Sequence, residues 1–78
     1  MKIIGTNGRG GVDTQAMLDK MVEAMYQMKN NNVEPSRIEV TQSEWDAIYK
    51  EMVAKGTVFI KCEGTNITIL GLDVVLKP

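Results

Sequence analysis

Residues 37–56 read RIEVTQSEWDAIYKEMVAKG, and this stretch decides the fold of the chain. Ile38 and Val40 alternate with polar residues, which is the pattern of a strand with one buried face. Thr41 and Glu44 have the spacing of a capping box, in which the side chain of each residue accepts a hydrogen bond from the backbone amide of the other. The stretch therefore predicts a strand that ends at Thr41 and passes directly into a helix.

The helix is predicted to end at Gly56, because glycine commonly follows the last helical turn. Asp46 precedes Lys50 by four residues, a spacing that favours an ion pair on the outer side of a helix. Glu51 and Lys55 have the same spacing. The apolar residues recur at helical intervals and should face the core; they are Trp45, Ile48, Tyr49, Met52 and Val53.

Another helix is predicted upstream, from about Thr14 to about Lys29, with Asp13 as its N-cap. Its apolar stripe is rich in methionine and comprises Met17, Leu18, Met21, Val22, Ala24, Met25 and Met28. Methionine is unbranched and polarisable, so the stripe suits either core packing or an adaptable contact with another protein. Core packing is the first interpretation. Because so short a chain has little interior, the four methionines are also a candidate subunit interface.

Residues 5–11 read GTNGRGG and are predicted to form a flexible loop, because glycine has no preferred backbone conformation. Gly5 and Gly10 have the spacing of a phosphate-binding loop. The next two residues, however, are glycine and valine, where that motif requires lysine and serine or threonine. We therefore favour a plain connector over a phosphate site. Arg9, together with Lys2, leaves open a contact with nucleic acid.

The chain after residue 56 has a β pattern. Val58, Ile60 and Cys62 alternate with other residues, which predicts a strand with these three side chains on its apolar face. Residues 64–66, GTN, predict a hairpin loop. The apolar residues then change phase by one position near Gly71. Either a bulge restores the register there, or the chain turns into a separate last strand.

The composition excludes several classes of protein. One cysteine and no histidine rule out an intramolecular disulfide framework and the usual zinc sites. The acidic residues form no pair suited to acid–base catalysis, so we expect neither an enzyme nor a cofactor. The net charge of −1 gives no general attraction to nucleic acid or anionic lipid. No signal peptide and no membrane span are expected, and an intracellular location follows.

The expected fold is a single α+β domain over residues 1–78. Two helices should pack on one face of a small, mainly antiparallel sheet, in the order (β)αβαββ. Residues 2–4 are apolar, but the run is short. They form either the first strand of this order, shown in parentheses, or a segment that lies over the core without pairing.

Several of these elements, in their order along the chain, resemble segments of known proteins. Pro35 lies in a polar turn, and it is followed by RIEV at 37–40, TQSEWDAI at 41–48 and LGLDVVL at 70–76. In this order the segments resemble short proteins encoded by tailed bacteriophages and prophages, most of which have no assigned activity. Residues 35–76 also resemble a strand–helix–strand segment of tailed-phage major capsid proteins, although Asp73 stands where that segment often has proline. The resemblance concerns fold elements only, so it implies no functional residue.

The chain has more apolar side chains than so short a domain can bury. This excess and the resemblance together predict a non-enzymatic bacteriophage protein that acts through protein–protein contact. It would be either a virion component or a factor directed against a host protein. We expect a homo-oligomer in the host cytoplasm or in the virion, without membrane association. The alternative is a nucleic-acid-binding accessory protein that uses the glycine-rich loop with Arg9.

Overall fold

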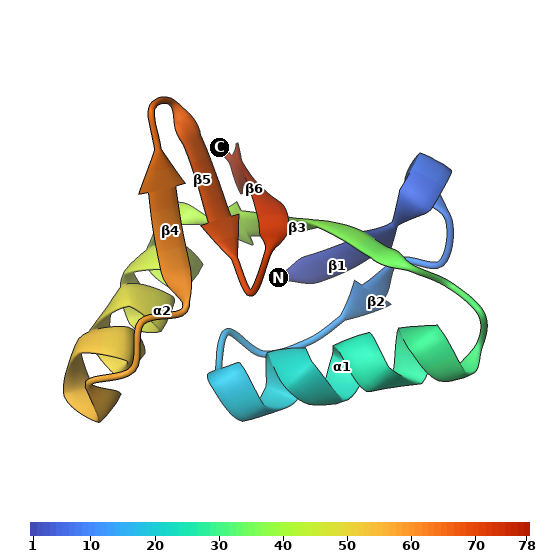
Figure 1. The fold of residues 1–78 in the computed structure, drawn as a ribbon, viewed down its shortest axis with the longest axis horizontal. Helices are drawn as coiled ribbons and strands as arrows, with labels where there is room; N and C mark the ends of the chain where they lie inside the picture. The colour runs from blue at the N-terminus through green and yellow to red at the C-terminus, as the bar shows by residue number, and fades with distance from the viewer.

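The computed structural model describes residues 1–78 and shows two helices on a six-stranded sheet (Figure 1). The helices are α1 (Leu18–Asn30) and α2 (Gln42–Lys55), and a short 3-10 turn, η1 (Thr6–Gly8), follows the first strand. The strands are β1 (Lys2–Gly5), β2 (Val12–Asp13), β3 (Pro35–Thr41), β4 (Ile60–Glu63), β5 (Asn66–Ile69) and β6 (Leu72–Lys77). The predicted α+β class is confirmed, and residues 2–4 do pair as a strand. None of the helices is long and apolar enough to cross a membrane.

The strands lie in the order β2-β1-β3-β6-β5-β4, and only the contact between β3 and β6 is parallel. This contact runs from Arg37 opposite Asp73 to Thr41 opposite Lys77. A parallel pair needs a long crossover connection, and here α2 with the β4–β5 hairpin provides it. The last strand of the chain therefore joins β2, β1 and β3 to the β4–β5 hairpin.

Both helices pack on the same face of the sheet, and one core forms there. The side chains of β3 alternate, so that Ile38 and Val40 are buried under the helices. Arg37 and Glu39 point to the opposite face, where Glu39 forms ion pairs with Arg37 at 3.8 Å and Lys77 at 3.5 Å. The core is completed by Ile3, Met21, Ala24, Met28, Ile48, Phe59, Ile60, Ile69 and Leu72.

The strand and helix at residues 37–56 follow the prediction closely. Thr41 Oγ1 accepts a hydrogen bond from the Glu44 amide at 3.3 Å, and Glu44 Oε1 accepts one from the Thr41 amide at 2.9 Å. Gly56 ends α2 with a left-handed φ of 66°. The ion pair between Glu51 and Lys55 also forms, at 2.8 Å. The expected pair of Asp46 with Lys50 does not form, because Asp46 accepts a hydrogen bond from Gln42 instead.

The predicted start of the first helix is wrong. Asp13 does not cap a helix; it pairs with Lys2 in the sheet as the end of β2. Thr14 is held outside the helix by Met1, whose carbonyl accepts the Thr14 amide at 3.0 Å and whose ammonium group donates to the Thr14 carbonyl at 3.2 Å. The residues expected to begin the helix therefore belong to the sheet or bond to its edge, and α1 begins only at Leu18.

The segment from Thr57 to Asn66 also departs from the prediction. Phe59 is buried, whereas Val58 precedes the strand and is exposed. Cys62 is exposed too, although it was expected on a buried face. The hairpin loop contains two residues and not three, because Asn66 already pairs with Glu63.

The phase change near Gly71 marks a separate last strand. β5 ends at Ile69, and β6 begins at Leu72 directly opposite it. The two intervening residues, Leu70 and Gly71, have φ values of 53° and 82°. Two successive positive φ values define the tight turn that best matches the twist of a hairpin. The bulge considered from the sequence is therefore not needed.

Candidate protein-binding face

The helices do not cover the whole of the sheet face on which they pack. Ile60, Ile69 and Leu72 form one row across β4, β5 and β6, and all three are buried. The neighbouring pair toward the hairpin tip, Cys62 opposite Ile67, has the same orientation but is exposed. Because side chains alternate along a strand, both residues point to the helix side. The sheet therefore extends beyond α2 and leaves apolar side chains uncovered.

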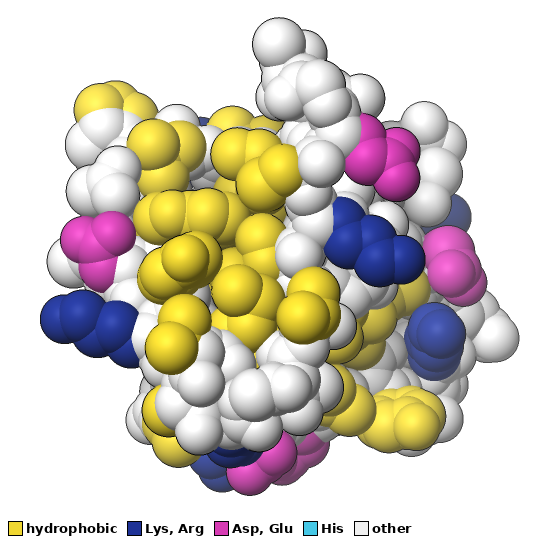
Figure 2. Space-filling view, turned by 60° about the vertical axis from the view of Figure 1, so that its left-hand side comes forward, with side chains coloured by type: hydrophobic (Ala, Val, Ile, Leu, Met, Phe, Trp, Pro, Cys, Tyr) yellow, Lys and Arg dark blue, Asp and Glu magenta, His cyan; other side chains and the backbone are white.

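A shallow hollow of about 150 Å³ lies at this uncovered end, lined by Gln42, Trp45, Ile67, Val74 and Leu76. Trp45 is half-buried, and Leu76 is 54% exposed. Tyr49 follows Trp45 by one helical turn, so it lies on the same side of α2, and it is 51% exposed. Six residues make up this apolar face: Trp45, Tyr49, Cys62, Ile67, Val74 and Leu76. Figure 2 shows hydrophobic side chains gathered over a broad area on this side of the molecule.

The first turn of α2, which carries Trp45, is held by hydrogen bonds and an ion pair. Glu44 closes the capping box and also forms an ion pair with the ammonium group of Met1. The ammonium group, followed by the Thr41 amide, lowers the pKa of Glu44 from its ordinary value of 4.5. A charged carboxylate in the first turn is favoured by the helix dipole. The first turn of α2, which carries Trp45, is thus tied to the chain end and to β3.

The predicted methionine interface is divided by the fold. Met21 and Met28 are buried in the core, so they present no surface to another molecule. Met17 is exposed just before α1, and Met25 is half-buried. Met25 contributes to a second apolar hollow, of about 220 Å³, together with Val22, Tyr26, Lys29 and Leu70.

The glycine-rich loop has a polar character and no cluster of positive charge. Arg9 lines a hollow of about 300 Å³ with Thr6, Asn7, Asn32, Val33 and Glu34. Glu34, an acidic residue, lines the same hollow as Arg9 but forms no ion pair with it. Lys2 lies on β1 and pairs with Asp13 on one side and Glu39 on the other. The two basic residues proposed from the sequence are therefore each accompanied by acidic residues.

The loop is held in a defined path by backbone hydrogen bonds. Gly5 belongs to β1, and its amide donates to the Arg9 carbonyl at 2.9 Å. The Thr6 amide donates to the Glu34 carbonyl at 3.0 Å. A side chain on Gly5 would meet Val33 and the Arg9 carbonyl oxygen, so the close approach of these segments requires glycine.

The sequence predicted the elements of the apolar face but not its exposure. Tyr49 and Cys62 were both expected in the core. Cys62 and Ile67 do point to the helix side, but both of them and Tyr49 are exposed. The only sequence signal was that so short a chain has little interior for its apolar residues.

No group of three or more histidine, cysteine, aspartate or glutamate residues is arranged to hold a metal ion. No protein-family model, curated protein or solved structure matches the chain. Its function must therefore be inferred from the residues and their geometry.

Proposed function

We propose that the protein is a non-enzymatic binding protein that holds another protein on its apolar face. The observation that carries the proposal is that Ile67 and Leu76, on the helix side of the sheet, are 37% and 54% exposed. Contiguous exposed apolar side chains on a small domain are typical of interaction sites. Burying them against a partner would supply the main favourable free energy of binding.

A protein fits this face better than a small molecule or a membrane. The hollow of about 150 Å³ is smaller than the roughly 300–1,000 Å³ of typical ligand pockets. The net charge of −1 gives no attraction to anionic lipid headgroups. Trp45 and Tyr49 add aromatic side chains, which commonly dominate the binding energy of protein interfaces. The exposed Gln42 and Asp46 lie nearby on α2 and supply polar groups for a rim.

The resemblance to short proteins of tailed bacteriophages supports the view that this binding takes place in a phage or in its host. The partner would then be another component of the phage particle or a protein of the bacterial host. Mass spectrometry of purified particles separates these two cases. Detection in stoichiometric amounts indicates a virion component, whereas absence from particles with expression early in infection indicates a host-directed factor.

The binding proposal can be tested with two neighbouring residues of β6. Leu76 belongs to the apolar face, whereas Val75 points to the opposite face and is 38% exposed. Immobilised protein is used to capture partners from infected cells, and the captured protein is then purified and titrated by calorimetry. We expect Leu76→Asp to weaken binding at least ten-fold and Val75→Asp to leave it unchanged.

Circular dichroism of both variants must first show the wild-type spectrum. Equal affinity of the Leu76→Asp variant and the wild-type protein for the purified partner would contradict the proposal. So would a partner whose binding is lost only in Val75→Asp.

Nucleic-acid binding through the glycine-rich loop is the second candidate. It is favoured by Arg9, which forms no ion pair within the chain and lines a polar hollow with two asparagines. Fluorescence anisotropy with single-stranded and double-stranded oligonucleotides tests it. Binding should weaken with added salt and with Arg9→Ala, and an anisotropy that stays flat at low salt removes this candidate.

A further inference from the structure

We propose that two copies of the chain associate through their β4 strands, in antiparallel orientation, so that their sheets become one. β4 lies at the end of the strand order and has a neighbour on one side only. The other end of the sheet is β2, which is only two residues long. β4 is therefore the longer free edge, and an unpaired edge is a template for another strand.

The backbone of β4 shows which residues are free to pair. The Phe59 carbonyl accepts a hydrogen bond from the Leu70 amide at 3.0 Å, so Phe59 turns its peptide groups toward the β5 side. Peptide groups alternate in direction along an antiparallel strand. Lys61 and Glu63 therefore also turn theirs toward β5, whereas Ile60 and Cys62 direct theirs to the open edge. Gly64 lies in the turn with a φ of 61°, so only its amide points to the open edge. A second β4 strand could form about four hydrogen bonds with these groups.

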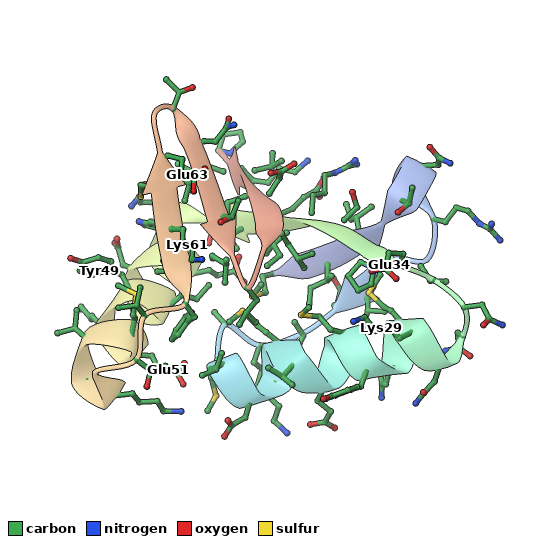
Figure 3. All side chains as sticks on the ribbon, viewed as in Figure 1. Lys29, Glu34, Tyr49, Glu51, Lys61 and Glu63 are labelled. Atoms are coloured by element: carbon green, nitrogen blue, oxygen red, sulfur yellow. The ribbon has the colours of Figure 1, made fainter.

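The charges of β4 select one register for this pairing. Lys61 and Glu63 are exposed, lie on the side of the sheet opposite the helices, and form no ion pair within the chain (Figure 3). When the two-fold axis passes through Cys62, Lys61 of each copy lies directly opposite Glu63 of the other. Opposite charges at such positions stabilise a strand pair.

The other registers lack these opposite-charge pairs. An axis through Lys61 places two lysines opposite each other, and an axis through Glu63 places two glutamates opposite each other, which is destabilising. An axis between residues would set an outward-facing peptide group against one that is already bonded to β5. A lysine on an edge strand usually discourages pairing. Here Lys61 is followed two residues later by Glu63. In the register centred on Cys62, each lysine lies opposite a glutamate of the other copy, so the charges attract.

The same register places apolar groups together on the helix side. Cys62 would lie opposite Cys62 of the second copy, and the adjacent Ile67 of each chain would lie beside the new contact. The two apolar faces would then form one continuous surface across the dimer. The α carbons of such a hydrogen-bonded pair are about 5.5 Å apart, a distance that a disulfide can span.

Sedimentation equilibrium of the purified chain tests the dimer. We expect twice the mass of 8.7 kDa found for one chain. Lys61→Glu and Glu63→Lys should each raise the dissociation constant at least ten-fold, because each variant places like charges opposite each other. The double variant restores both opposite-charge pairs and should return to within about three-fold of the wild-type constant. Lys29→Glu is the matched control, since Lys29 is exposed on α1, far from Lys61 and Glu63 of β4 (Figure 3).

Thiol cross-linking provides an independent readout. Diamide accepts the two hydrogen atoms of two thiols, and the two sulfurs then form a disulfide. Cross-linking through Cys62 should be fast in the wild type and in the double variant, and at least ten-fold slower in either single variant. A wild type that stays monomeric at millimolar concentration would overturn the proposal, as would a double variant that behaves like the single ones.

The dimer and the binding of a partner can fail separately. Leu76 is not on the free edge, so Leu76→Asp should still dimerise while it no longer binds a partner. The dimer is measured with the purified chain alone, which needs no knowledge of that partner.

Discussion

Glu51 of α2 accepts a hydrogen bond from the backbone amide of Leu18, the first residue of α1, with 2.9 Å between nitrogen and oxygen. The other carboxylate oxygen of Glu51 pairs with Lys55 at 2.8 Å. The residue before α1 is Met17, which has no side chain that could satisfy the free amides of the first turn. A side chain from the second helix therefore provides the cap that the first helix lacks.

Glu51→Ala should destabilise the protein by about 1 kcal/mol, the usual cost of losing a helix N-cap. Urea denaturation followed by circular dichroism measures the change. Glu23→Ala is the control, because Glu23 lies on α1 and forms only an exposed ion pair with Lys20 at 3.8 Å. That variant should change the free energy of unfolding by less than about 0.5 kcal/mol. Equal effects of the two variants would show that Glu51 does not act as a cap.

The stability should decrease in acid because of Glu44 and Glu51. The Met1 ammonium group lowers the pKa of Glu44, and Lys55 followed by the Leu18 amide lowers the pKa of Glu51. A carboxyl group with a lowered folded-state pKa stabilises the fold fully above its ordinary pKa, here 4.5. The stabilisation is lost as the pH falls through the lower folded-state pKa.

Thermal unfolding between pH 7 and pH 3 checks this expectation. The melting temperature of the wild type should stay nearly constant down to about pH 5 and then fall. The double variant Glu44→Gln, Glu51→Gln should start from a lower melting temperature and show a shallower fall. Parallel curves for the two proteins would mean that other carboxylates cause the acid sensitivity.

The second helix and its strand could be predicted because their signals are local. The capping box joins residues three apart, and Gly56 ends the helix through its own backbone preference. A local signal does not depend on how distant segments pack. For the same reason, the parallel pairing of β3 with β6 had no counterpart in the sequence, since it joins residues more than thirty positions apart.

The start of α1 could not be predicted because a distant segment decides it. Asp13 and Thr14 carry good capping side chains, and sequence alone favours a helix from that point. Pairing of Val12 and Asp13 with β1 takes these residues into the sheet instead. The cap that replaces them comes from Glu51, which lies more than thirty residues away in the chain.

Burial was predicted less well than orientation. The period of a strand shows which residues share a face, and Cys62 and Ile67 do point to the helix side with Ile60 and Ile69. Whether a helix covers that face depends on its length and position. α2 leaves the hairpin end uncovered, so the residues of the apolar face looked like core residues in the sequence.

Two isoleucines of β5 should differ sharply in their contribution to stability. Ile69 is fully buried, whereas Ile67, two residues away on the same face, is 37% exposed. Ile69→Ala should cost about 2–5 kcal/mol, because it leaves a cavity in the core. Ile67→Ala should cost less than about 1 kcal/mol in the isolated chain. Urea denaturation of both variants measures the difference, and similar costs would mean that the hairpin end is covered in solution.

The turn between β5 and β6 should depend on glycine at position 71. Gly71 has a φ of 82°, and a side chain there would meet no atom within 4 Å. Any cost of substitution therefore comes from the backbone conformation alone. Gly71→Ala should destabilise the chain by about 1–2 kcal/mol, because a β carbon disfavours the left-handed region. Gly71→Asn should cost clearly less, since asparagine tolerates this region. Urea denaturation of the two variants provides the comparison, and a larger loss for asparagine than for alanine would show that space, not backbone conformation, limits the turn.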